Sequence, residues 1–258
     1  MTRPLFEIDG LAVDVPGRRL IDKLTLTLPE GSMTALIGHN GSGKSTLLKV
    51  LARQIRPAAG TVRFGGRPLA DWPGRELARE LAFLPQYTPA AEGMLVHELV
   101  ALGRYPWHGA LGRPGPADHA AIEEAIEVCA LGPITDRLVD TLSGGERQRA
   151  WLAMMIAQGA RCLLLDEPIS ALDIAHQIDV LALVRRLCEE QGRSVVVVLH
   201  EVNMSARFCD HVVAMREGAV CLEGGPADLM TPEALARVYG LPMQVLSRPD
   251  GAPVAIPA

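Results

Sequence analysis

Polar and apolar residues alternate near the start of the chain, which is the pattern of a strand with one buried face. Leu24, Leu26 and Leu28 alternate with threonines, and Pro16-Gly17 separates this run from an earlier one. The period of two predicts antiparallel strands within residues 3–28, joined by a turn at the Pro-Gly pair.

A short apolar run at residues 33–37 predicts a buried strand, and residues 46–55 place apolar side chains at helical spacing. Residues 57–60 contain a proline and a glycine that interrupt the chain before two more predicted strands, at 61–64 and 81–86. We therefore expect the first 86 residues to be rich in strands and to contain one helix.

Helical spacing dominates from residue 96 to residue 159, with expected turns around Tyr105-Pro106 and at residues 112–116. An apolar stripe with glutamates on the opposite side is formed by Ile122, Ala125, Ile126 and Cys129. From the residues alone, we expect Tyr105, Pro106 and Trp107 to form an apolar turn between helices. Burial of these side chains in the core is as well supported as their contact with a membrane partner. The segment predicts a helical subdomain inserted in an α/β core.

Strand and helix alternate again at residues 162–165, 174–188 and 195–199, which predicts a parallel sheet with crossover helices. A short helix is predicted at residues 232–239. The proline-rich end that follows it is expected to be disordered.

Composition is that of an ordinary globular protein: 48% of the 258 residues are hydrophobic and 21% are charged. The net charge of -5 argues against a nucleic-acid binder, which usually carries a basic face. No apolar run is long enough to cross a bilayer, and the start lacks the apolar core of a signal peptide, so we expect a cytoplasmic protein. Five scattered cysteines favour free thiols over disulfides or zinc.

A phosphate-binding loop, Gly38-His39-Asn40-Gly41-Ser42-Gly43-Lys44-Ser45-Thr46, joins the predicted strand at 33–37 to the helix behind it. Its glycines let backbone N–H groups turn inward around a phosphate chain, and the helix start adds its positive dipole end. Lys44 is expected to reach the β and γ phosphates and Ser45 to offer a hydroxyl to Mg²⁺. The loop predicts a site for a nucleoside triphosphate.

Two carboxylates, Asp166 and Glu167, end the apolar strand that starts at Cys162. With a phosphate loop in the same chain, Asp166 is the expected Mg²⁺ partner and Glu167 the base that accepts a proton from the attacking water. His200 ends another predicted strand and could hydrogen-bond the γ phosphate. Gln86 also follows a strand and could touch Mg²⁺ or the water. Because ligands bind beyond the carboxyl ends of parallel strands, Gly38, Asp166 and His200 are expected to converge.

A second segment, Leu142-Ser143-Gly144-Gly145-Glu146-Arg147-Gln148-Arg149, has the composition of an anion-binding helix start. Ser143 is a natural N-cap, and the two glycines allow close approach of a backbone. A capped helix with no further role remains an alternative, since one triphosphate does not need two cradles from one chain.

The order of these segments resembles the ATP-binding subunit of ATP-binding cassette (ABC) transporters over nearly the whole chain. The resemblance implies an α/β P-loop NTPase of the ABC type, with a mostly parallel core sheet, an N-terminal antiparallel β subdomain and an inserted helical subdomain. It places the core in residues 1–95 and 160–225, the helical subdomain in 96–159 and a C-terminal extension in 226–258.

The family packs two copies head to tail, so the resemblance implies that Ser143, Gly144 and Gly145 of one copy face the ATP on the other. Gln86 then matches the loop that senses the membrane subunits, Asp173 the loop across the dimer interface, and His200 the switch histidine. The nucleotide-binding residues implied in one or the other copy are Gly38, Asn40, Gly41, Ser42, Gly43, Lys44, Ser45, Thr46, Ser143, Gly144, Gly145 and Asp173. Those implied around Mg²⁺ are Ser45, Gln86 and Asp166, and those in catalysis are Glu167, His200 and Gln86.

Within the family, residues 103–113, 172–177 and 38–41 are similar to the ATPases of ferric-hydroxamate (siderophore) importers. This similarity implies permease subunits, an extracytoplasmic binding protein and a peripheral position on the cytoplasmic face of the inner membrane. ATPases of haem or vitamin B12 importers are the alternative, and an exporter subunit or a soluble ABC protein acting on nucleic acids or ribosomes is disfavoured.

Two positions depart from the family pattern. Residues 14–17 hold no aromatic residue to stack on adenine, which implies weaker base selectivity, with van der Waals contact from Val15 as a substitute. Ile169 stands where a threonine is usual, but both carboxylates remain and an active enzyme is expected.

Overall fold

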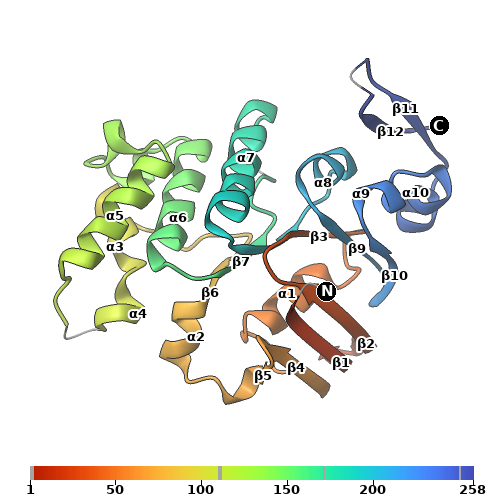
Figure 1. Cartoon of the computed structure of the whole chain (residues 1–258), viewed down its shortest axis with the longest axis horizontal. Coiled ribbons are helices and arrows are strands. Elements are labelled where there is room, and N and C mark those ends of the chain that lie inside the picture. The colour runs from red at the N-terminus through yellow and green to blue at the C-terminus, as the bar shows by residue number, and fades with distance from the viewer. Residues whose placement is uncertain (1–2, 110–111, 171, 250) are drawn as a thin grey trace. The chain divides into compact units, whose positions relative to one another are not determined.

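The computed structural model describes residues 3–109, 112–170, 172–249 and 251–258 (Figure 1). The chain divides into two compact units: Met1–Asp71 with Ser194–Ala258, and Trp72–Arg193. The division into a core, a helical subdomain and a C-terminal extension, which the family resemblance implies, stays a prediction. Among the described residues, no helix combines the length and the apolar character that crossing a membrane requires.

The first unit contains a four-stranded antiparallel sheet in the order β2-β1-β4-β5, coloured red to orange in Figure 1. Its strands are β1 (Pro4–Val15), β2 (Arg18–Pro29), β4 (Ala59–Phe64) and β5 (Arg67–Pro68), and the 3-10 turn η1 (Leu69–Asp71) follows. Leu24, Leu26 and Leu28 are buried, and the rings of Phe6 and Phe64 lie 4.9 Å apart. The predicted antiparallel pair and its turn are confirmed.

A second set of strands in the first unit surrounds β3 (Met33–Ile37), all of whose residues are buried. β3 pairs in parallel with β8 (Ser194–Val198) and β9 (His211–Arg216), and β10 (Ala219–Gly224) adds an antiparallel edge. The helices of this unit are α1 (Lys44–Leu51), α8 (Val202–Phe208), α9 (Pro226–Leu229) and α10 (Pro232–Tyr239). The predicted helix at 232–239 is confirmed.

The second unit combines two parallel strands, β6 (Leu81–Leu84) and β7 (Cys162–Asp166), with several helices. These are α2 (Gly74–Glu80), α3 (Val96–Leu102), α4 (Tyr105–His108), α5 (Pro116–Val128), α6 (Gly144–Gln158) and α7 (Ile174–Gln191), with 3-10 turns η2 (Gly132–Ile134) and η3 (Val139–Thr141). Helices α3, α5 and α6 pack on one another (Figure 1). Ala125 and Cys129 are buried, and Glu123, Glu124 and Glu127 are exposed, as the apolar stripe predicts.

The structure corrects three expectations about secondary structure. Helix α2 is a second helix among the first 86 residues, where only one was expected. Leu77 is its one buried residue, so its sequence shows no apolar stripe that would predict a helix. The segment at Tyr105 forms helix α4 instead of a turn. The proline-rich end forms a hairpin of β11 (Met243–Ser247) and β12 (Pro253–Pro257), which exchanges two hydrogen bonds with Asn203 of α8 at Ala255.

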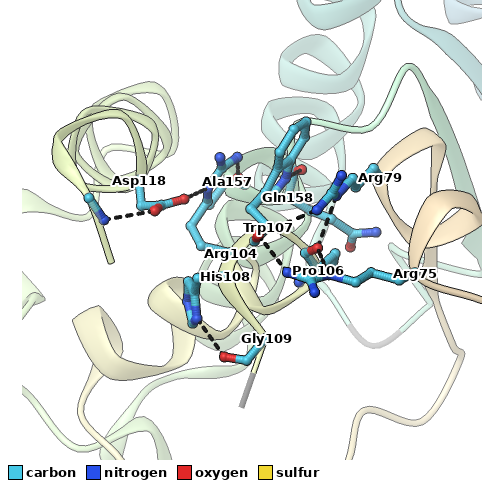
Figure 2. Close-up of polar contacts among 11 residues, drawn as sticks. Arg75, Arg79, Arg104, Pro106, Trp107, His108, Gly109, Asp118, Ala157 and Gln158 are labelled. Atoms are coloured by element: carbon cyan, nitrogen blue, oxygen red, sulfur yellow. Dashed lines mark hydrogen bonds and ion pairs between the residues drawn. The ribbon is translucent and has the colours of Figure 1, made fainter. Parts of the chain in front are cut away.

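Helix α4 is held by side chains from neighbouring elements (Figure 2), and its Pro106 lies in the first turn, where proline is compatible with a helix. Arg75 donates to the carbonyl oxygens of Pro106 and Trp107 at 2.7 and 2.6 Å, and Arg79 donates to Pro106 at 3.0 Å. The Trp107 ring lies 4.9 Å from the Arg79 guanidinium and 4.7 Å from that of Arg104, and its Nε1 donates to a carbonyl of α6. Cation–π contacts and bonds to helix-end carbonyls therefore fix this single turn.

Candidate functional site

The phosphate loop lies between the end of β3 and the start of α1, as the sequence predicts. Gly38 has a φ of 133°, and a Cβ there would come within 2.1 Å of the carbonyl oxygen of Met215 on β9. Gly43 caps α1 with a φ of 105°. These two positions need glycine because the loop turns in the left-handed region and, at Gly38, lies directly on a neighbouring strand.

Lys44 and Ser42 are the buried polar side chains of this loop. Nζ of Lys44 donates to the carbonyl oxygens of Gly38 and His39 at 2.8 Å each, so the ammonium spans the mouth of the loop. The hydroxyl of Ser42 is buried and has no hydrogen-bond partner within the described part of the chain. An ammonium, a buried hydroxyl and a helix N-terminus on one curled backbone fit the oxygens of a phosphate chain.

A cavity of about 420 Å³ opens beside the loop. It is lined by Arg18, Arg19, Leu20, His39, Asn40, Gly41, Ser42, Arg216 and Glu217. Arg19 is engaged by Asp14 and Asp22 at 2.9 and 3.1 Å. None of the lining side chains is a Phe, Tyr or Trp, and the half-buried Val15 is not among them. The volume suits a small ligand, and arginines surround it where an aromatic ring is absent.

Helix α10 supports the phosphate loop from the C-terminal part of the first unit. The rings of Tyr239 and His39 form a T-shaped pair with centroids 6.2 Å apart, and a Cβ on Gly240 would lie 3.7 Å from His39 Nε2. Burial raises the pKa of Tyr239 to about 12. Sequence reasoning missed this contact because nothing in the local pattern of α10 points to a loop 200 residues earlier.

Asp166 and Glu167 follow one another at the end of β7 in the second unit. Asp166 is fully buried, and Glu167 has a φ of 52°, a strained value for a residue other than glycine. Gln86 lies two residues beyond β6, the parallel neighbour of β7, and its Nε2 donates to Oε2 of Glu167 at 2.7 Å. The structure therefore brings together the predicted sensor glutamine and the predicted general base.

Ser143 caps helix α6, which confirms the predicted N-cap. Its hydroxyl accepts from the backbone N–H of Glu146 at 3.3 Å, and Glu146 accepts from the N–H and the hydroxyl of Ser143 at 2.8 Å each. These hydrogen bonds hold the pKa of Glu146 below its usual value, and the nearby Arg137 adds to the effect. Gly144 is exposed at the helix start, whereas Gly145 is buried.

Asp173 caps helix α7. One of its carboxylate oxygens accepts from the backbone N–H of His176 at 3.0 Å, and Nδ1 of His176 lies 2.8 Å from the other. These two hydrogen bonds, the backbone one first, lower the pKa of Asp173. The neighbouring Ala171 lies outside the described residues, as do Ala110 and Leu111 of the segment that resembles siderophore importers.

His200 is exposed just beyond β8, the parallel neighbour of β3. The first unit thus carries the phosphate loop and His200 at the carboxyl ends of adjacent strands, and the second unit carries Gln86 and the two carboxylates in the same way. The convergence of Gly38, Asp166 and His200 stays a prediction, because Gly38 and His200 belong to the first unit and Asp166 belongs to the second.

Ser45, Gln86 and Asp166 stay predicted Mg²⁺ ligands, and the oxygen atoms of their side chains are of the kind that this ion prefers. The described residues contain no cluster of three or more His, Cys, Asp or Glu that could form a complete metal site. Mg²⁺ usually keeps waters and takes one or two protein ligands together with substrate phosphates. Ser45 at the start of α1 and Asp166 at the end of β7 offer oxygen ligands of that kind.

The loop, the capped helix start and the strand-end carboxylates define a P-loop nucleoside triphosphatase. A family model described as ABC transporter matches residues 21–170. A solved ABC transporter structure in an inward-facing conformation is similar with a TM-score of 0.86 and 26% identity, covering 99% of this chain and 98% of the other. The chain belongs to the ABC transporter family, as its ATP-binding and ATP-hydrolysing part.

Curated relatives extend the match over almost the whole chain. Probable siderophore transport system ATP-binding protein YusV of Bacillus subtilis is 44% identical, over 92% of this chain and 87% of the relative. Iron(3+)-hydroxamate import ATP-binding protein FhuC of the same species is 39% identical, over 93% and 90%. Hemin import ATP-binding protein HmuV of Rhodococcus jostii is also 39% identical, over 96% and 85%.

Proposed function

We propose that this chain is the ATPase that energises import of an iron(III)–siderophore complex of the hydroxamate type through a membrane permease. The observation that carries the proposal is the similarity to siderophore and hydroxamate import proteins over more than nine-tenths of the chain. The hydrogen bond between Gln86 and Glu167 supports this proposal, because it connects the residue assigned to partner sensing with the residue assigned to hydrolysis.

In the proposed mechanism the phosphate loop binds ATP through its backbone N–H groups, Lys44 and the hydroxyl of Ser42. Ser45 and Asp166 would hold Mg²⁺, which would supply positive charge to offset the negative charge of the triphosphate. Glu167 accepts the proton of the attacking water, and His200 hydrogen-bonds the γ phosphate. Gln86 holds the carboxylate of Glu167 in place until the nucleotide and the water are bound.

Two copies complete the proposed site. Ser143, Gly144 and Gly145 of one copy face the γ phosphate on the other, and Asp173 lies at the interface between them. The capped start of α6 is suited to this role, because its N–H groups and dipole favour an anion. Each ATP then has two cradles, one from each copy.

The proposed partners are permease subunits in the inner membrane, with the chain on their cytoplasmic face, and an extracytoplasmic binding protein that supplies the cargo. Helix α4 is a suitable part of the permease contact. Its Tyr105 and Trp107 are 55% and 39% exposed, yet the arginines of Figure 2 hold the helix rigid. Rigid exposed aromatic residues are typical of interface anchors.

Uptake of iron-labelled ferric hydroxamate by cells that lack this chain tests the proposal. Cells complemented with the wild type should regain uptake, whereas cells complemented with Glu167→Gln should not. Uptake that never depended on the chain would refute the cargo assignment.

Haem is the second candidate cargo, favoured by the similarity to hemin import proteins, and vitamin B12 is the third. The same complemented cells distinguish them when labelled hemin or cobalamin replaces the siderophore. ATP-dependent recovery of the chain with ribosomes or DNA, and not with a membrane protein, would instead indicate a soluble ABC protein.

A further inference from the structure

The imidazole of His176 lies against Gly145 at the start of α6. A Cβ added to Gly145 would come within 2.7 Å of His176 Cδ2 and 3.0 Å of Cγ, so the ring occupies the space that any larger residue would need. Gly145 is buried, although the Gly144 beside it is exposed. The absence of a side chain at position 145 therefore creates the seat for the His176 ring.

Asp173 fixes the other side of the same ring. Nδ1 of His176 lies 2.9 and 2.8 Å from the two carboxylate oxygens of Asp173, and the backbone N–H of His176 donates to one of them. Asp173 also caps α7, and Gln177 donates to the carbonyl oxygen of Leu172 at 2.9 Å. The ring orientation and the start of α7 are thus determined by one set of contacts.

We propose that His176 is a positioning residue that couples the Ser143–Gly145 segment to Asp173. This inference rests on the proposed function, in which both segments meet the second copy and its nucleotide. The ring acts as a spacer between the starts of α6 and α7, so the donors on α6 and the carboxylate on α7 approach the second copy as one rigid surface. Displacement of such donors by about 1 Å is enough to reduce a rate roughly a hundredfold.

The test measures formation of the ATP-bound dimer in a Glu167→Gln background by size-exclusion chromatography with light scattering. His176→Ala should raise the ATP concentration for half-maximal dimer about tenfold or more, because the starts of α6 and α7 lose their common spacer. Binding of ATP to a single copy, which depends on the phosphate loop, should stay within about twofold. His119→Ala on α5 is the matched control, since His119 is exposed and far in sequence from both segments.

His176→Phe separates packing from a general loss of stability. It keeps a ring over Gly145 and the backbone N–H that donates to Asp173, and it loses only the contact of Nδ1 with the Asp173 carboxylate. Its dimer should therefore form at an ATP concentration closer to that of the parent than the dimer of His176→Ala does. Equal defects in the two variants would overturn the packing role, and thermal melts that match the parent would show that both are folded.

A second-site test uses Gly145→Ala. Its Cβ should displace the ring and weaken the dimer, but the loss should not add to that of His176→Ala, because the ring is then already absent. Full additivity of the two defects would contradict the proposal. If Glu167→Gln itself forms no ATP-dependent dimer, the proposed function fails; if it does and His176→Ala matches it, this inference alone fails.

Discussion

Gly38→Ala is the most informative change in the phosphate loop, because Gly41→Ala provides a control in the same loop. Both residues have positive φ, 133° and 77°, so alanine is strained at either one. A Cβ at Gly38 would lie 2.1 Å from the Met215 carbonyl oxygen, whereas a Cβ at Gly41 meets nothing within 4 Å. The two positions differ in available space, and the φ of Gly38 is also farther than that of Gly41 from the left-handed values that alanine can adopt.

The expected magnitudes follow from these distances. Gly41→Ala should cost about 1–2 kcal/mol, the cost of a left-handed residue with a Cβ. Gly38→Ala adds a clash that needs the loop to move by about 1.2 Å to reach an ordinary carbon–oxygen contact of about 3.3 Å. Overpacking of this kind costs a further 1–3 kcal/mol or so. The same shift misplaces the N–H groups that bind phosphate, which should weaken ATP binding by about tenfold to a hundredfold.

Urea unfolding and calorimetric titration with ATP measure the two effects. We expect Gly38→Ala to be less stable than Gly41→Ala and to bind ATP much more weakly. Equal stability and affinity in the two variants would show that the close approach to Met215 does not shape the loop, and the reasoning would be wrong.

Four further outcomes are expected. Asp118→Ala should destabilise the chain by about 3 kcal/mol in urea, because it leaves Arg104 buried without its 2.8 Å partner, whereas exposed Asp179→Ala should change stability by less than about 0.5 kcal/mol. The hydrogen bonds from Gly115 and Arg104 lower the pKa of Asp118, so its contribution is present above about pH 4 and should disappear as the pH falls below that in acid titration of the wild type. Maleimide labelling at pH 8 should modify half-buried Cys221 before Cys129, whose pKa burial raises to about 12; the opposite order in peptide mapping would contradict the packing. GTP should compete with ATP within about tenfold, since no aromatic ring lines the cavity, and strong rejection of GTP would show another base contact.

The phosphate loop could be predicted because its chemistry is local. Three closely spaced glycines, Lys44 and a strand-to-helix transition occupy a few residues, and the structure places them as expected. The same holds for Ser143, whose capping partner Glu146 is three residues away. Local hydrogen bonds of this kind leave a direct mark on the sequence.

Contacts between distant segments could not be predicted in the same way. Helix α4 depends on Arg75 and Arg79, about 30 residues earlier, and the C-terminal hairpin depends on Asn203. The packing of His176 on Gly145 joins two helix starts, and only the spacing Asp173-x-x-His176 hints at one half of it. Such contacts depend on tertiary packing, which outweighs local propensity.

The rate of ATP hydrolysis by the purified chain tests the central claim most directly. The wild type should hydrolyse ATP in the presence of Mg²⁺, and Glu167→Gln should bind ATP with similar affinity but hydrolyse it at least a hundredfold more slowly, because an amide cannot accept the proton from water. A Glu167→Gln rate equal to that of the wild type would contradict the assignment of the general base and the mechanism built on it.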